Sequence, residues 1–198
     1  MEAAPGIYSM GQSQGGNVHA FLLDDGNGLT LIDTLFDADA GRILAQVQAI
    51  GKTVQDIKHI ISGDRSPQPV SILPYPPYRT YPLQIGLNLN LARHAPVNVD
   101  HFVHEGDRIG PVQVLFAPGH SPGHLAFYWP ERRALVTGDA VCTWPTFMLG
   151  WKGFLLNPKQ HQVSLRRLAE LDAEVLCVGH GEPLTSGGAT RLRAALHR

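Results

Sequence analysis

Three side chains of the types that bind metal ions each follow a glycine at the end of an apolar, strand-like run. They are His120 and His180, each in a Gly-His pair, and Asp139, in a Gly-Asp pair. In α/β proteins, ligands gather at the carboxyl ends of strands, and glycine lets the backbone turn tightly there. Imidazole and carboxylate groups hold zinc and similar ions. The repeated construction therefore predicts a metal centre.

The other histidines give weaker signals. His124 begins the next predicted strand, four residues after His120, and is expected to orient a ligand without binding the ion itself. His101 and His104 lie three residues apart on a predicted strand, so their side chains should point to opposite faces. The remaining histidines carry no pattern and are interpreted as structural or solvent-exposed: His19, His59, His94, His161 and His197.

Large apolar side chains crowd the loop after Asp139. The members of this cluster are Trp144, Phe147, Met148, Trp151 and Phe154. They are suited to line a substrate pocket, to form an oligomer contact or to pack in the core. The sequence alone does not choose among these three roles.

The predicted elements alternate between strands and helices along the chain. Strands are predicted over residues 7–10, 18–23, 29–33, 57–61, 99–103, 112–117, 124–129, 134–137 and from residue 175. Asp37 or Asp39 is expected to cap a helix that runs to about residue 49. Further helices are expected from Asn157, which precedes a proline, and after Gly188. This order predicts a mixed α/β architecture.

Residues 62–98 differ from the rest of the chain. Six prolines lie between residues 66 and 82, and they exclude a central strand or an uninterrupted helix there. We predict an irregular surface segment within a single domain that spans residues 1–198.

Composition narrows the class of protein. A net charge of -1 and a pI of about 6.8 do not favour partners such as nucleic acid or an anionic membrane. The two cysteines cannot form a disulfide framework, and Cys177 reads as a small buried hydrophobe. Neither a signal peptide nor a membrane span is visible, so we expect a cytoplasmic protein.

The motifs that contain His120, Asp139 and His180, in this order and preceded by Leu-Ile-Asp-Thr at residues 31–34, resemble the metallo-β-lactamase superfamily of metal-dependent hydrolases. The resemblance implies an αββα sandwich, two mixed sheets flanked by helices. It also implies two metal ions, often zinc, that activate a bridging water. His120 would then bind the first ion, Asp139 would bridge both, and His180 would bind the second. Asp33 matches a supporting aspartate of the family, which is not a ligand.

The most diagnostic motif of that family, His-x-His-x-Asp-His, is missing. It should follow the strand at residues 57–61, but the chain contains no His-x-His and continues Ser-Gly-Asp-Arg-Ser-Pro. Either the motif was substituted in place or a block of roughly 30 residues was removed, about one strand-helix-strand crossover. We favour removal, because only the proline-containing loop that follows this block in the family is present. A gene-model artefact would produce the same junction.

Removal has structural and chemical consequences. One strand and one helix would be lost, which would expose part of the core and favour marginal stability or homo-oligomer formation. His120, Asp139 and His180 would hold at most one ion, weakly, with zinc expected and manganese or iron as alternatives. The leading hypothesis is a hydrolase of an ester, thioester, lactone or similar bond in an unidentified small molecule. The alternatives are an inactive member that serves binding or assembly, and a truncated version of an intact two-metal enzyme.

Overall fold

The structure is a computed structural model, and it describes residues 1–13, 17–63 and 99–197. Within these residues the strands are β1 (Glu2–Ala4), β2 (Ile7–Gln12), β3 (Val18–Asp24), β4 (Leu29–Ile32), β5 (Ile57–Ile61), β6 (Arg108–Ile109), β7 (Val112–Phe116), β8 (Leu125–Trp129), β9 (Ala134–Val136) and β10 (Val175–Cys177). The α-helices are α2 (Gly41–Ala49), α4 (Pro158–Ala169) and α5 (Gly188–Leu196). Short 3-10 helices are η1 (Val54–Asp56), η3 (Pro130–Arg132), η4 (Gly138–Ala140) and η5 (Lys152–Phe154).

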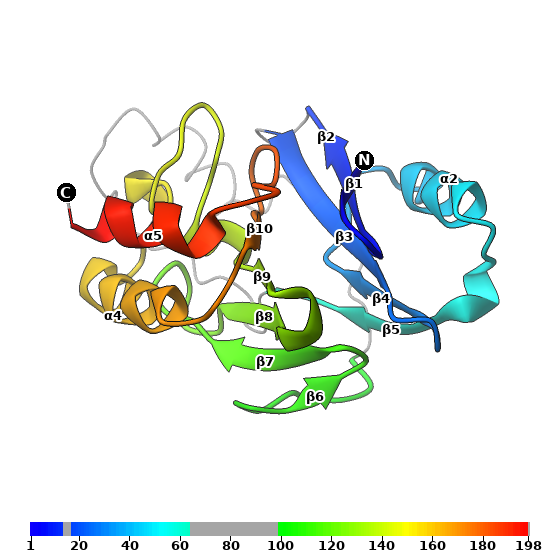
Figure 1. Cartoon of the computed structure of the whole chain (residues 1–198), viewed down its shortest axis with the longest axis horizontal. Helices are drawn as coiled ribbons and strands as arrows, with labels where there is room; N and C mark the ends of the chain where they lie inside the picture. Colours follow the sequence, from blue (N-terminus) through cyan, green and yellow to red (C-terminus); the bar gives the residue numbers. More distant parts are fainter. Residues whose placement is uncertain (14–16, 64–98, 198) are drawn as a thin grey trace, which may run out of the picture.

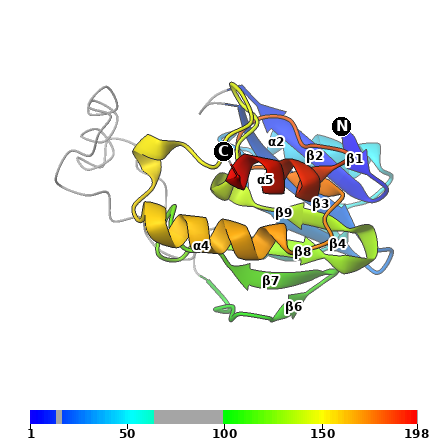
Figure 2. The ribbon, with the colours of Figure 1, turned by 60° about the vertical axis from the view of Figure 1, so that its left-hand side comes forward.

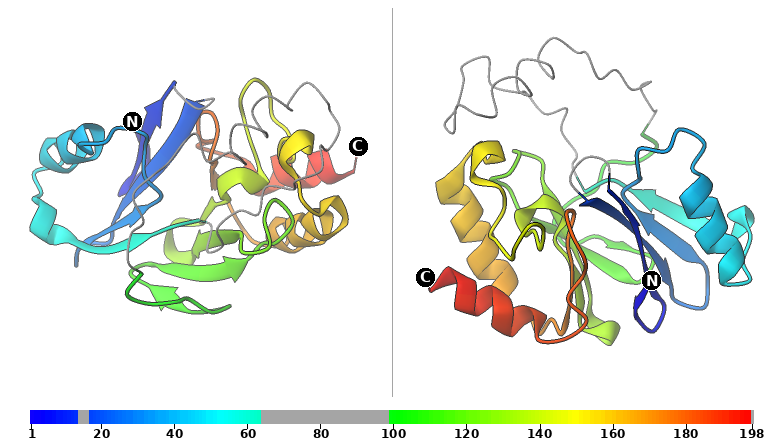
Figure 3. Two further views of the ribbon diagram at one scale, coloured as in Figure 1. Left: turned by 180° about the vertical axis from the view of Figure 1, so that it is seen from behind. Right: turned by 90° about the horizontal axis from the view of Figure 1, so that it is seen from above.

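The elements form four layers (Figures 1 and 3). One sheet has the order β1-β2-β3-β4-β5, and the other has the order β10-β9-β8-β7-β6. Helix α2 covers the outer face of the first sheet, while α4 and α5 lie side by side on the outer face of the second (Figure 2). The predicted fold class, an αββα sandwich of two mixed sheets, is confirmed.

Both sheets are built in the same way. Neighbouring strands are antiparallel except for the last pair of each sheet, β4 with β5 and β9 with β10, which are parallel. Parallel neighbours need a crossover connection, and helices α2 and α4 supply it. The carboxyl ends of the strands in these pairs carry the loops of Asp33, Asp139 and His180, and the loop of His120 follows β7.

Three clusters of buried apolar side chains hold the layers together. The cluster between the two sheets includes Phe21, Ile32, Phe127, Val136 and Cys177. A second cluster joins α4 and α5 to the second sheet, and a third joins α2 to the first. Each fully buried side chain of this size contributes roughly 1.5–3 kcal/mol. Cys177 is fully buried, as predicted from its apolar surroundings.

The helix starts follow the predictions in part. Asn157 caps α4, where its side chain accepts a hydrogen bond from the backbone N–H of Gln160. The N-cap position of α2 is Ala40 and not Asp37 or Asp39, so that prediction was wrong. Both carboxylates nevertheless accept backbone N–H groups of the first turn of α2, which explains the sequence signal.

Three local predictions need correction. Residues 99–103 form no strand; Val99 and Phe102 are exposed, at 64% and 72%, and Val103 is partly buried against the core between the sheets. His101 and His104 are therefore not on a strand. The short strands β1 and β6 were not predicted, because two or three residues carry no detectable periodicity and depend on pairing with β2 and β7.

Some predictions concern residues that the structure does not describe. All but the first two residues of the predicted irregular segment 62–98 lie outside the described ranges. The single domain and the missing strand and helix consequently stay predictions. No helix within the described ranges is long and apolar enough to cross a membrane.

Candidate metal centre

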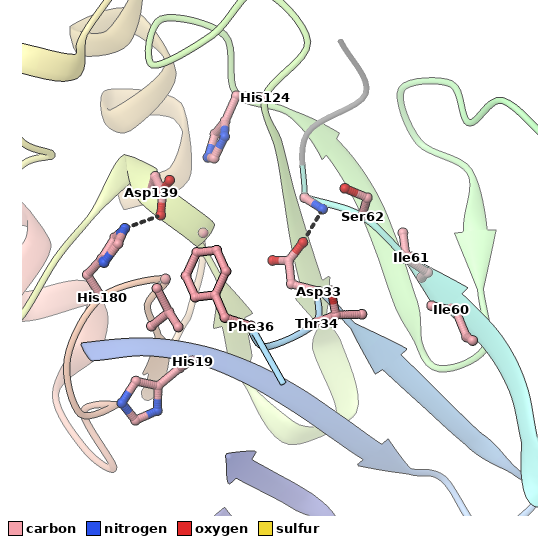
Figure 4. Close-up of a pocket in the computed structure, with 14 residues that line it drawn as sticks. His19, Asp33, Thr34, Phe36, Ile60, Ile61, Ser62, His124, Asp139 and His180 are labelled. Atoms are coloured by element: carbon pink, nitrogen blue, oxygen red, sulfur yellow. Dashed lines mark hydrogen bonds and ion pairs between the residues drawn. The ribbon is translucent and has the colours of Figure 1, made fainter. Parts of the chain in front are cut away.

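The three predicted ligands meet at the edge of the second sheet. The Nε2 atom of His120 lies 3.4 Å from one carboxylate oxygen of Asp139, and Nε2 of His180 lies 3.3 Å from the other. Asp139 thus stands between two imidazoles, each delivered by a different loop. Figure 4 shows the contact between His180 and Asp139 at the wall of the pocket.

Glycines make this convergence possible. A Cβ atom on Gly179 would lie 2.2 Å from Oδ1 of Asp139, so a larger residue before His180 would displace the carboxylate. Gly119 has a φ of +137°, and its Cβ would lie 2.3 Å from the Cα of His161 in helix α4. Both positions need glycine because backbone or ligand atoms approach where a side chain would begin.

Asp139 is anionic across the physiological range. Burial alone would raise the pKa of its carboxyl group, but the hydrogen bond from His180 and the charges of the neighbouring histidines lower the pKa to about 2. The side chain remains 34% exposed toward the pocket. A permanent negative charge between two imidazoles is the electrostatic arrangement that attracts a divalent cation.

The donor types fit a zinc-like ion, since two imidazoles and a carboxylate are the three protein ligands of many catalytic zinc sites. Yet within the described ranges, no group of three or more His, Cys, Asp or Glu side chains is arranged to hold an ion. The carboxylate of Asp139 instead contacts both imidazoles directly.

His124 lies beside this group and is tied to it by two contacts. Its Nε2–H donates a hydrogen bond to the carbonyl oxygen of Thr137 at 3.0 Å, and its ring packs edge-on against His120 at 5.5 Å between centroids. It thereby connects the loop of His120 to the turn that presents Asp139. This placement suits the supporting role predicted for His124, which stays a prediction.

Asp33 directly follows strand β4 on the opposite side of the pocket. Its φ of +59° is left-handed, a conformation that aspartate tolerates better than most residues. The carboxylate accepts the backbone N–H of Gly63 at 2.6 Å, and the carbonyl oxygen of Gly63 accepts the N–H of Leu125 in β8. Asp33 therefore fixes the chain that leaves β5 and, through Gly63, connects the two sheets.

The pocket between the sheets has a volume of about 350 Å³ and includes Asp139, His180, His124 and Asp33 in its lining. The rest of its lining comes largely from the first sheet and includes residues that the sequence analysis did not select: His19, Thr34, Phe36, Ile60 and Ile61. Phe36, which is 48% exposed, points into the space between Asp33 and Asp139 in Figure 4. The sequence feature that could have identified Phe36 as a lining residue is its position just beyond the carboxyl end of β4.

His19 is the clearest omission among these. It is buried on β3, where its Nδ1 lies 2.7 Å from the hydroxyl oxygen of Ser9. Burial lowers the pKa of His19 below its usual range. Its backbone N–H donates to the carbonyl of Gly179, so β3 also supports the loop that carries His180.

The chain belongs to the metallo-beta-lactamase superfamily. The model of that family matches residues 68–180, more than half of the chain. The matched range contains His120, Asp139 and His180, and it begins beyond the end of β5. The family assignment made from the three Gly-ligand motifs is thus confirmed.

Relatives and solved structures agree with this assignment. Hydroxyacylglutathione hydrolase of Ruegeria pomeroyi is 36% identical over 107 residues, 52% of this chain and 40% of that protein. The chain thus spans less than half the length of the first curated relatives it matches. A metallo-beta-lactamase family protein from Thermus thermophilus shares the fold with a TM-score of 0.65 and 22% identity, over 96% of this chain and 79% of that one.

A further relative aligns with nearly the whole chain. The uncharacterized protein YobT of Bacillus subtilis aligns over 210 positions at 24% identity, covering 91% of this chain and 90% of that protein.

Proposed function

We propose that this chain is a metal-dependent hydrolase with a reduced metal centre, in which His120, Asp139 and His180 hold one ion. The observation that carries the proposal is that both imidazoles contact the same carboxylate, at 3.4 and 3.3 Å. A carboxylate that bridges two ions would make the same two contacts, so the number of ions is inferred from the sequence, which has no His-x-His-x-Asp-His motif to complete the coordination of a second ion. We therefore expect a single shared ion, with zinc expected and manganese or iron as alternatives.

The roles of the chain's own residues follow from their contacts. When bound, the ion would supply an acidified water and polarise a carbonyl group. Asp139 holds the negative charge that compensates the ion, and His124 fixes the turn that presents Asp139. Asp33 positions the far wall of the pocket through Gly63. Phe36 and Ile60 give that wall an apolar surface against which an acyl group can pack.

The proposed substrate is a small molecule with an ester, thioester, lactone or similar bond. Relatives named hydroxyacylglutathione hydrolases align with up to half of this chain, which favours a thioester of glutathione as the first substrate to test. Loss of one of two ions predicts slow turnover, because a single weakly held ion supplies less activated water at a given metal concentration.

The test combines metal analysis with turnover. Full-length protein supplemented with zinc, manganese or iron should retain no more than one ion per chain and should hydrolyse an acyl-glutathione slowly. His120→Ala should abolish both properties, whereas His104→Ala, at an exposed position outside the pocket, should leave both unchanged. Protein that retains no metal after supplementation, or hydrolysis that survives His120→Ala, would contradict the proposal.

A second candidate function is non-catalytic binding or assembly. The observation in its favour is the exposed apolar surface on β5, where Ile60 is 68% exposed although it belongs to a strand. Under this alternative the protein would associate with itself or with a partner and would show no metal-dependent turnover. The same measurements separate the two candidates.

A further inference from the structure

The four aromatic residues of the apolar cluster in the loop after Asp139 divide into two groups in the structure. Phe147 packs against the core beneath α4 and α5, and the guanidinium of Arg191 lies 5.2 Å from its ring centre. The other aromatic residues, Trp144, Trp151 and Phe154, contact one another in a row. Only the first group is explained by core packing.

The central residue of this row, Trp151, packs on the imidazole of His180. The ring centroids of Trp151 and His180 are 4.4 Å apart, and the ring planes are inclined by 30°. This is the closest of the ring pairs described, and it is near the lower limit for offset-stacked aromatic rings. Trp151 is absent from the pocket lining, so it covers His180 from outside the cavity.

Trp151 is itself held on several sides. Its indole N–H donates to the carbonyl oxygen of Trp144 at 3.3 Å, and its ring packs against Trp144 at 5.9 Å and Phe154 at 5.7 Å between centroids. The indole thus has little freedom to leave His180. A fixed indole restricts the imidazole in turn.

The backbone of His180 is tied to the same loop. Its carbonyl oxygen accepts the N–H groups of Thr143 and Trp144, at 2.9 and 3.3 Å. Figure 3 shows the loop after Asp139 beside the turn that follows β10. The residues on either side of His180 are glycines, which have no side chains to restrict its ring. Contacts from other segments must therefore set the ring orientation.

We propose that Trp151 is the positioning residue of His180: the indole stack keeps the imidazole turned so that its Nε2 atom faces Asp139. The proposal rests on the proposed function only where it concerns the ion. In the metal-free protein, the stack maintains the 3.3 Å contact between His180 and Asp139. With an ion present, the same orientation would keep His180 available as a ligand.

The first test does not depend on metal. In histidine-labelled protein, the ring protons of His180 are identified by their loss in His180→Gln. In the wild type, the ring current of the indole should shift the resonances of these protons away from their usual chemical shifts. The shift should disappear in Trp151→Leu and should be partly retained in Trp151→Phe. Unchanged His180 resonances in Trp151→Leu would overturn the proposal, whatever the protein binds.

The second test uses Co²⁺ alone as the probe. Trp151→Leu should weaken Co²⁺ binding about three- to tenfold, the equivalent of one lost aromatic pair, and Trp151→Phe should restore most of it. Phe147→Leu is the matched control, because it removes a ring from the same loop that has no described contact with His180. Equal weakening in both leucine variants would overturn the specific role of Trp151. Absence of Co²⁺ binding in the wild type would contradict the proposed function. The resonance test would still show whether Trp151 positions the ring of His180.

Discussion

The two sheets have the same construction but contribute differently to the pocket. Loops from the second sheet place Asp139 and His180 in the pocket lining, and the buried His120 contacts Asp139 from outside that lining. The first sheet delivers a hydrogen-bonded aspartate, Asp33, and apolar side chains such as Phe36. In each sheet the strands of a terminal parallel pair, joined by a helix, end near the site. The two sheets therefore have the same strand arrangement but present side chains of different chemistry.

The difference indicates that the hydrogen bonds on the first-sheet side of the pocket are separable from the candidate metal ligands on the second-sheet side. The hydrogen bonds from Gly63 to Asp33 and from Leu125 to Gly63 lie on the side where the sequence has no His-x-His-x-Asp-His motif after β5. Backbone groups near the core must be paired whether or not a metal is present. The first-sheet side of the pocket is therefore held by hydrogen bonds that do not need a metal ligand.

The largest effect on stability is expected from a substitution of Gly119, which precedes His120 in a loop of the second sheet. Gly119→Ala would place a Cβ 2.3 Å from the backbone of His161 at a φ of +137°, so we expect the free energy of unfolding to fall by about 3–5 kcal/mol. Chemical denaturation measures it. Gly187→Ala is the control, since its Cβ would meet nothing within 4 Å and should cost only about 1 kcal/mol. Equal losses in the two variants would refute the steric argument.

His161, which lies beside Gly119, should make the stability of the second-sheet side depend on pH. Burial in α4 lowers the pKa of its imidazole from 6.5 to about 4, and its Nε2–H donates to the carbonyl of Leu149. Between these values the unfolded chain binds a proton that the folded one does not, so stability falls as pH drops from 6.5 to 4. The loss should reach up to about 3 kcal/mol. His161→Gln should show a shallower decline in denaturation series across that window; parallel curves would refute it.

Asp33 tests the first-sheet side. Asp33→Ala removes an acceptor of a backbone N–H and places alanine at a φ of +59°, so we expect a loss of about 1.5–3 kcal/mol in stability. Asp33→Asn keeps an acceptor and tolerates this conformation, and it should lose less. Metal content should not change in either variant while the protein is folded. A loss of metal from folded Asp33→Asn would show that the two sides are not separable.

Ile60 should give the smallest effect on stability. Ile60→Thr keeps a β-branched residue at an exposed position and should change the free energy of unfolding by less than about 0.5 kcal/mol. If the first sheet has lost cover, the substitution should reduce concentration-dependent association in sedimentation velocity experiments. Val54→Thr, at an exposed position in η1, serves as the control. If the wild type and Ile60→Thr sediment identically, the protein does not associate through β5.

The longer elements of the fold were predictable because their patterns are local. The strand pairs around residues 24–28, the helix cap at Asn157 and the glycine-ligand motifs all depend on neighbouring residues, and the structure contains them. Residues 99–103 have the composition of a strand but find no partner to pair with among the described residues. Pairing is a tertiary property, so composition alone overestimates such segments.

The sequence by itself determined the family, the αββα class and the identity of the candidate ligands, because short motifs at strand ends encode them. Only the tertiary structure decided that His120 and His180 share one carboxylate, that Phe36 and His19 line the pocket and that Trp151 covers His180. Trp151 and His180 are 29 positions apart in the chain. Distances between such residues are fixed by the packing of sheets and loops, and a one-dimensional pattern does not contain that information.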